Sequence, residues 1–209
     1  LVGSEMCIRD SFIPAVGLVV IPVAGAPLAA ASEGVLRELA FALNMTGFGA
    51  GVFMYVGLLA LTMARHFLGA PVEGKMTPTL WVHLAPLSVI PLSMLALLKT
   101  TGDASLLRYG SLVAAAFLGA ALWWLVLAVS MTIRNRRQGK LPFALSWWAF
   151  VFPIGACSVL AYRVSELLAL EVLPLVASGL TLLALFVWSA TALGTVRGIR
   201  TGAIFAPAH

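Results

Sequence analysis

The sequence predicts an all-α integral membrane protein, because its composition and its pattern are those of a chain that has lipid as its solvent. Hydrophobic residues make up 61% of the 209 positions, charged residues only 10%, and the mean hydropathy is +1.03. Apolar runs of the roughly 20 residues needed to cross a bilayer recur six times. The ten-residue alternation of a transmembrane barrel is absent from the sequence. We therefore expect a bundle of six spanning helices.

The first ten residues are interpreted as foreign to the protein. The string Val2-Gly3-Ser4-Glu5-Met6-Cys7-Ile8-Arg9-Asp10-Ser11 resembles the translated end of a sequencing adapter, so residues 1–10 are set aside as an artefact. Without them the chain starts at Phe12, inside an apolar run. We expect residues 11–209 to be the C-terminal part of a longer transmembrane transporter or channel domain.

The six spans are expected at residues 12–31, 39–64, 79–98, 109–133, 146–162 and 173–196. Turn-forming clusters separate the first five spans: Ser32-Glu33-Gly34, Gly69-Ala70-Pro71, Thr101-Gly102-Asp103 and Gly139-Lys140-Leu141-Pro142. An ion pair of Arg163 with Glu166 is expected at the end of the fifth span, and Pro174 marks the start of the sixth. Because the connections are short, consecutive helices should form antiparallel hairpins.

Lysine and arginine are distributed unequally between the two ends of these hairpins. Eight lie at one end, namely Arg65, Lys75, Arg134, Arg136, Arg137, Lys140, Arg197 and Arg200. Four lie at the other, namely Arg37, Lys99, Arg108 and Arg163. Because cytoplasmic loops carry the excess of basic residues, we expect a multi-pass protein of the bacterial cytoplasmic (inner) membrane with a cytoplasmic C-terminus.

Interior prolines are confined to alternate spans. The first span carries Pro14 and Pro22, the third Pro86 and Pro91, and the fifth Pro153. An interior proline removes a backbone hydrogen bond and bends the helix, and in lipid the freed carbonyl must face protein or a wet cavity. We expect these three helices to bend around a pore and the other three to face lipid. The alternative is that prolines are simply common in membrane helices.

The spans show no machinery for catalysis. No acid or base lies near the centre of a span, and the histidines, at positions 66, 83 and 209, form no pair at matching depth. We interpret His83 as an interfacial imidazole beside Trp81, and the glycines from Gly47 to Gly51 as a helix-packing motif. We expect no catalytic residue, no cofactor, no metal and no nucleic-acid partner. A membrane enzyme whose catalytic residues lie in an N-terminal part upstream is the alternative.

Two phenylalanines in the fifth span point in different directions. At 100° per residue, the side chains of Phe150 and Phe152 lie about 200° apart, so only one can face the bundle axis. The face of Phe152 continues through Ala149, Gly155, Ala156 and Val159, whereas that of Phe150 continues through Trp147, Ile154 and Cys157. One aromatic ring in a lane of small residues is typical of a hydrophobic constriction. The alternative is that Phe152 fills a gap beside a glycine.

Three strings are similar to the tellurite-resistance and dicarboxylate transporter family. They are Ser146-Trp147-Trp148-Ala149-Phe150-Val151-Phe152-Pro153, Phe12-Ile13-Pro14-Ala15-Val16-Gly17 and Leu84-Ala85-Pro86. The family includes the slow-type anion channels of plants, a malate permease and sulfite efflux pumps. The resemblance implies ten helices in five hairpins, with the odd helices around a central pore and the present six spans as the fifth to tenth. It also implies a homotrimer in the lipid bilayer.

The resemblance also implies roles for particular residues. Phe152 would be the ring that closes the pore, with Phe150 as the fallback if the register is shifted. The residues expected to line the pore or bend its helices are Pro22, Pro86, Pro91, Pro153, Gly155 and Ala156. The substrate would be a small anion: a C4-dicarboxylate, a tellurite-like or sulfite-like oxyanion, or an inorganic anion.

Overall fold

The computed structural model describes residues 2–68, 77–141 and 143–202, and this part of the chain consists of helices joined by turns. In chain order the helices are α1 (Val2–Ala31), α2 (Gly34–Leu68), α3 (Thr77–Val82), α4 (Leu84–Thr100), α5 (Ala104–Arg137), the 3-10 helix η2 (Leu145–Phe150), α6 (Val151–Leu168) and α7 (Leu173–Arg200). Within these ranges, six helical stretches are long and apolar enough to cross a membrane. The predicted all-α membrane class is confirmed.

Several predicted features fall on residues that the structure leaves undescribed. They include the turn at Gly69-Ala70-Pro71, Lys75, Pro142 and His209, together with the side chain of His66.

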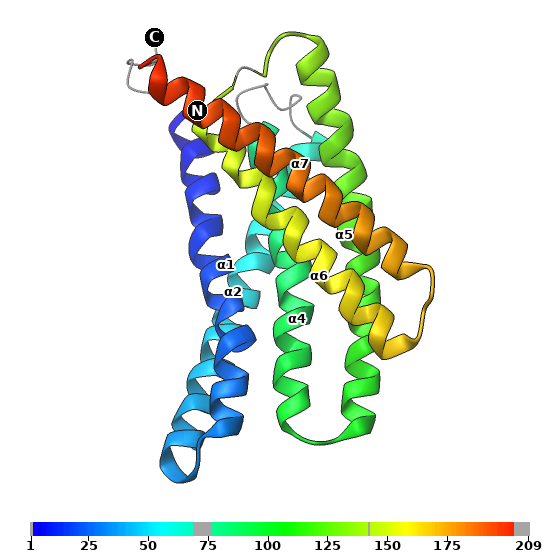
Figure 1. The fold of residues 1–209 in the computed structure, drawn as a ribbon. Coiled ribbons are helices and arrows are strands. Elements are labelled where there is room, and N and C mark those ends of the chain that lie inside the picture. Colours follow the sequence, from blue (N-terminus) through cyan, green and yellow to red (C-terminus); the bar gives the residue numbers. More distant parts are fainter. Residues whose placement is uncertain (1, 69–76, 142, 203–209) are drawn as a thin grey trace.

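The long helices form three antiparallel hairpins, α1–α2, α4–α5 and α6–α7 (Figure 1). Helix α4 lies between the other two hairpins. The α1–α2 and α4–α5 turns lie at one end of the bundle, while the N-terminus, the C-terminus and the α5–η2 connection lie at the other. Helix α4 contacts α1, α5 and α6, and 78% of the most apolar stretch of the third span, Leu80–Thr100, is buried, compared with 17% for the second span and 11% for the sixth. The third span is therefore the core of this part of the molecule.

Local sequence explains the turns between the hairpins. The Asp103 carboxylate caps α5 by accepting hydrogen bonds from the backbone N–H groups of Ser105 (2.8 Å) and Leu106 (3.2 Å). Gly102 precedes it with φ +71°, a backbone conformation that glycine adopts without steric cost. The expected ion pair between Arg163 and Glu166 closes the exposed end of α6 at 2.9 Å.

Glycines set the close approach of α1 and α2. A Cβ atom at Gly51 would lie 2.8 Å from the backbone nitrogen of Val19 on α1, and a Cβ at Gly47 would lie 2.8 Å from the Ile21 side chain. A Cβ at Gly49, on the other side of α2, would meet nothing within 4 Å. The predicted helix-packing motif is confirmed, and its contact residues are Gly47 and Gly51.

The third and fifth spans are each interrupted within a few residues of a proline. The breaks lie at His83, between α3 and α4, and at Phe150, between η2 and α6. Pro86 and Pro153 are consequently the third residues of α4 and α6. Because the first four N–H groups of a helix have no partner within it, neither proline removes a helical hydrogen bond. Pro22 and Pro91, by contrast, lie inside the continuous helices α1 and α4, and the bending of the three spans around a pore stays a prediction.

Candidate functional site

Helix α6 has one face that packs in the core and one that does not. The packed face carries Phe150, Ile154, Cys157, Leu160, Ala161 and Val164, all buried. On the other face Phe152 is 52% exposed and Val159 is 49% exposed. A Cβ added to Gly155 between them would meet nothing within 4 Å. The structure thus separates the two phenylalanine rings as the helical spacing predicts.

Phe150 is held in place by two tryptophans. Its ring centroid lies 5.2 Å from that of Trp81 on α3 and 5.8 Å from that of Trp147 on η2, and both contacts are edge-to-face. Such geometry is favourable for aromatic pairs, and burial of the rings adds the larger hydrophobic contribution. Phe150 is therefore an anchor between the two short helices α3 and η2.

Phe152 shares its open face with the small residues singled out by sequence. Gly155 and Ala156 follow it on α6, and both are only partly covered in the described part of the chain. The other predicted site residues are buried between helices: Pro22 on α1, Pro86 and Pro91 on α4, and Pro153 on α6. Of the predicted set, the structure therefore brings Phe152, Gly155 and Ala156 together on an open surface. The assignment of Phe152 as a gate stays a prediction.

The break at His83 lies inside an aromatic cluster. The imidazole is 1% exposed, with its centroid 4.3 Å from the Phe12 ring and 4.6 Å from the Trp124 ring. The Tyr55 ring lies 6.2 Å away. Rings from α1, α2 and α5 thus enclose His83, and its place at the membrane interface stays a prediction. Sequence spacing gave no signal for this cluster, since its members lie on four separate helical segments.

Hydrogen bonds tie the short helix α3 to α5. The Trp124 indole N–H donates to the carbonyl oxygen of Leu80 at 2.6 Å, and the Trp81 indole N–H donates to the Thr132 hydroxyl at 2.9 Å. At the end of α5, the Asn135 amide donates to the Thr77 hydroxyl at 2.7 Å. Each of these polar groups is thereby satisfied within an apolar environment, where an unmade hydrogen bond is costly. These hydrogen bonds fix the position of α3, and with it the interruption at His83.

Helices α4 and α6 each begin at an interruption within a span. The two helices have 17 and 18 residues. Helix N-termini carry a partial positive charge, and discontinuous membrane helices use it to attract anions. Two such helix starts are a feature suited to an anion.

The buried hydroxyls of the spans are engaged in helix packing. Ser93 on α4 donates to the Val19 carbonyl on α1, and Ser158 on α6 donates to the Ala177 carbonyl on α7 at 2.9 Å. Ser88 donates to the Leu84 carbonyl of its own helix at 2.8 Å. Across residues 2–68, 77–141 and 143–202, no three His, Cys, Asp or Glu side chains converge in a way that could hold a metal ion.

Comparison with known proteins places this arrangement in a family. The family described as "Voltage-dependent anion channel" matches residues 10–196. The chain belongs to this family. The match includes α6 with Phe152 and runs through the greater part of all six membrane-spanning stretches. It confirms the resemblance to the tellurite-resistance and dicarboxylate transporters at the level of the family.

Two relatives of the chain come from Methanocaldococcus jannaschii, and both are named uncharacterized transporters. They are 34% and 33% identical over 194 residues, which is 93% of the present chain. The chain spans only 56% and 57% of the length of these relatives. No solved structure matches it.

Proposed function

We propose that this chain supplies six helices to a pore that conducts small anions across the membrane, and that the ring of Phe152 gates the pore. The family supports transport of anions, and the two relatives are named transporters. The gate proposal rests on the position of Phe152, which is exposed on a helix face whose nearest members, Gly155 and Ala156, are small. Hydrophobic rings can close a narrow passage by excluding water.

Anions would be attracted without a fixed charge at the constriction. The N-termini of α4 and α6 provide partial positive charge, and this interaction is weak enough for an ion to leave again. Basic residues at the α5–η2 end, such as Arg134, Arg137 and Lys140, raise the local anion concentration outside the membrane. Both features favour conduction of a small anion over its tight binding.

The substrate class is a small anion, either a C4-dicarboxylate, a tellurite-like or sulfite-like oxyanion, or an inorganic anion. The charge asymmetry supports a bacterial cytoplasmic membrane location with the C-terminus in the cytoplasm. A homotrimer of the full-length protein would cover part of the apolar surface that α2 leaves exposed, such as Phe53.

The test is anion conductance in planar bilayers, using the protein expressed from its complete reading frame. We expect Phe152→Ala to raise the current about tenfold, which corresponds to lowering a barrier by about 1.4 kcal/mol. Chloride, nitrate, sulfite and malate gradients would then rank the anions. Phe186→Ala is the matched control, because Phe186 is 68% exposed on α7, away from the α6 face.

Unchanged current in Phe152→Ala would place the gate at another residue. If neither the wild type nor the variant conducts, the pore proposal is wrong, and a membrane enzyme with catalytic residues elsewhere in the protein becomes the better account.

A further inference from the structure

The third and fifth spans share a short sequence pattern around their interruptions. A tryptophan lies five residues before a proline in both: Trp81 precedes Pro86, and Trp148 precedes Pro153. In both spans the helix is interrupted between these two residues. The two spans, each with the long helix that follows it, can therefore be compared position by position.

The two tryptophans also make the same hydrogen bond to the helix that follows. The Trp81 indole N–H donates to the Thr132 hydroxyl on α5 at 2.9 Å, and the Trp148 indole N–H donates to the Thr195 hydroxyl on α7 at 3.2 Å. Each threonine donates its own proton to the carbonyl four residues earlier, at 2.7 Å and 2.8 Å respectively. The hydroxyl oxygen is thereby left to accept, since a hydroxyl has a single proton. These two contacts are called the Trp–Thr tethers below.

The two tethers lie in different surroundings. Trp81 is 4% exposed, and its helix α3 is also held to α5 by the hydrogen bonds of Trp124 and Asn135. Trp148 is 39% exposed, and its tether is the longer of the two. It lies on η2, a 3-10 helix, and 3-10 stretches inside longer helices often act as hinges. The tether of the fifth span is therefore the one that can open at lower cost.

This weaker tether lies next to the proposed gate. Phe152 follows Trp148 by four residues, about one helical turn. Further along α6, Ser158 donates to the Ala177 carbonyl on α7 at 2.9 Å, so the turn that carries Phe152 lies between two attachments to α7. In the third span the position of Phe152 is held by Ala85, which has no ring and is 2% exposed. An aromatic ring at this position thus occurs in the span with the weaker tether.

We propose that Trp148 and Thr195 are positioning residues of the gate: their hydrogen bond holds the first turn of α6 so that the Phe152 ring closes the pore. This inference rests on the proposed function of Phe152. With the tether formed, the ring stands on the face of Gly155 and Ala156, so the tether belongs to the closed state. An exposed hydrogen bond contributes little net free energy, which suits a contact that opens and closes. Loss of the tether shifts the population toward the open state.

The experiment is anion current in planar bilayers, using the protein expressed from its complete reading frame. Thr195→Val keeps the shape of the side chain and removes the acceptor oxygen. We expect it to raise the current about two- to fivefold, the effect of one net hydrogen bond on a closed–open equilibrium. Trp148→Phe removes the N–H donor and should have a similar effect, and the double variant should add nothing further. Thr195→Ser keeps the hydroxyl and should retain the wild-type current.

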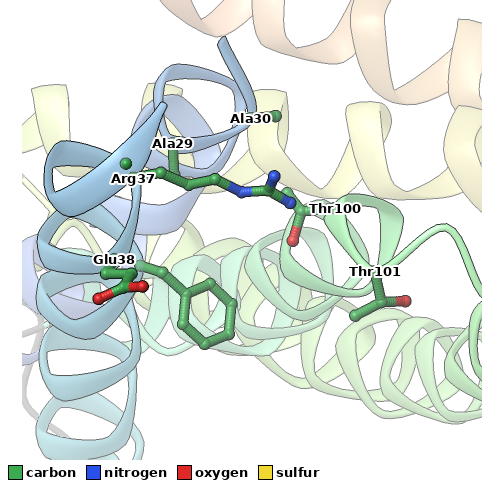
Figure 2. Close-up of a pocket in the computed structure, with 8 residues that line it drawn as sticks. Ala29, Ala30, Arg37, Glu38, Thr100 and Thr101 are labelled. Carbon is green, nitrogen blue, oxygen red and sulfur yellow. The ribbon is translucent and has the colours of Figure 1, made fainter. Parts of the chain in front are cut away.

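Three controls separate positioning of the gate from a general loosening of the fold. In the Phe152→Ala background, Thr195→Val should cause no further rise, because no ring is left to hold. Thr132→Val breaks the equivalent tether of the third span and should lower Tm without raising the current. Thr100→Val removes a hydroxyl from neither tether and should leave the current unchanged. Thr100 lies beside Arg37 in a pocket of about 600 Å³ where the ends of α1 and α4 meet the start of α2 (Figure 2).

Two results would overturn the tether proposal while the gate proposal stands. One is a Phe152→Ala variant that raises the current while Thr195→Val does not. The other is a Thr195→Ser variant that raises the current as much as Thr195→Val. A rise caused by Thr195→Val in the Phe152→Ala background would also contradict the tether proposal, because the hydroxyl would then act on something other than the ring. If Phe152→Ala leaves the current unchanged, the gate proposal fails and the tether proposal fails with it.

Discussion

The rings of Trp81 and Phe150 meet edge to face, with their centroids 5.2 Å apart and their planes inclined by 77°. This contact joins the two broken spans, because Trp81 lies on α3 just before the break at His83 and Phe150 is the residue at which η2 gives way to α6. Each break lies three residues before a proline, Pro86 in one span and Pro153 in the other. The two helix starts are thus fixed relative to each other by one aromatic pair.

Trp81→Ala should destabilise the protein. The substitution removes a buried ring contact with Phe150 and the hydrogen bond to Thr132, and loss of a buried tryptophan typically costs about 3–5 kcal/mol. Trp123→Ala is the control, because Trp123 on α5 is 50% exposed. Thermal unfolding in detergent should show a clear decrease in Tm for the first variant only, and equal decreases would show that the α3 contact is not special.

Gly51→Ala should loosen the α1–α2 hairpin. The new Cβ would lie 2.8 Å from the backbone nitrogen of Val19, and a backbone atom cannot move aside as a flexible side chain can. Gly49→Ala is the matched control, since its Cβ would meet nothing and alanine is favoured over glycine in helices by about 1 kcal/mol. We expect the first substitution to lower Tm and the second to leave it unchanged or raise it. The reverse order would contradict the helix contact.

Sequence predicted the features that depend on local pattern. Hydropathy located six spans, and the 100° spacing of α6 placed Phe150 and Phe152 on different faces. Hydropathy underestimated the length of the helices. Helix α5 continues to Arg137, beyond the expected end at 133, because helical hydrogen bonding does not stop where the apolar composition does. Span boundaries drawn from hydropathy alone are therefore shorter than the helices.

Features that depend on contacts between distant segments could not be predicted. The burial of His83 requires Phe12, Tyr55 and Trp124 to converge from three other segments. The pocket around Arg37 requires the tips of two hairpins to meet. Sequence shows the missing N–H of Pro86 and Pro153 but not that a helical segment starts just before each of them.

Asp103→Ala should remove the cap of α5. The carboxylate accepts two backbone N–H groups, and replacing such a cap by alanine costs about 1 kcal/mol. Asp103→Asn keeps an acceptor oxygen and should retain most of the stability. Equilibrium unfolding in a denaturing detergent would measure both, and equal losses would mean that the negative charge matters more than the hydrogen bonds.

The two phenylalanines at the junction of η2 and α6 should give opposite results in two measurements. Phe150 is 5% exposed and packed against tryptophans, so Phe150→Ala should lower the free energy of unfolding by about 3–5 kcal/mol. Phe152 is 52% exposed, so Phe152→Ala should leave Tm nearly unchanged while raising the anion current. The comparison distinguishes a gating role for Phe152 from a packing role for Phe150. A loosened fold cannot account for a higher current if the Phe152→Ala variant keeps its normal stability. A rise in current confined to Phe150→Ala would move the gate to the fallback residue.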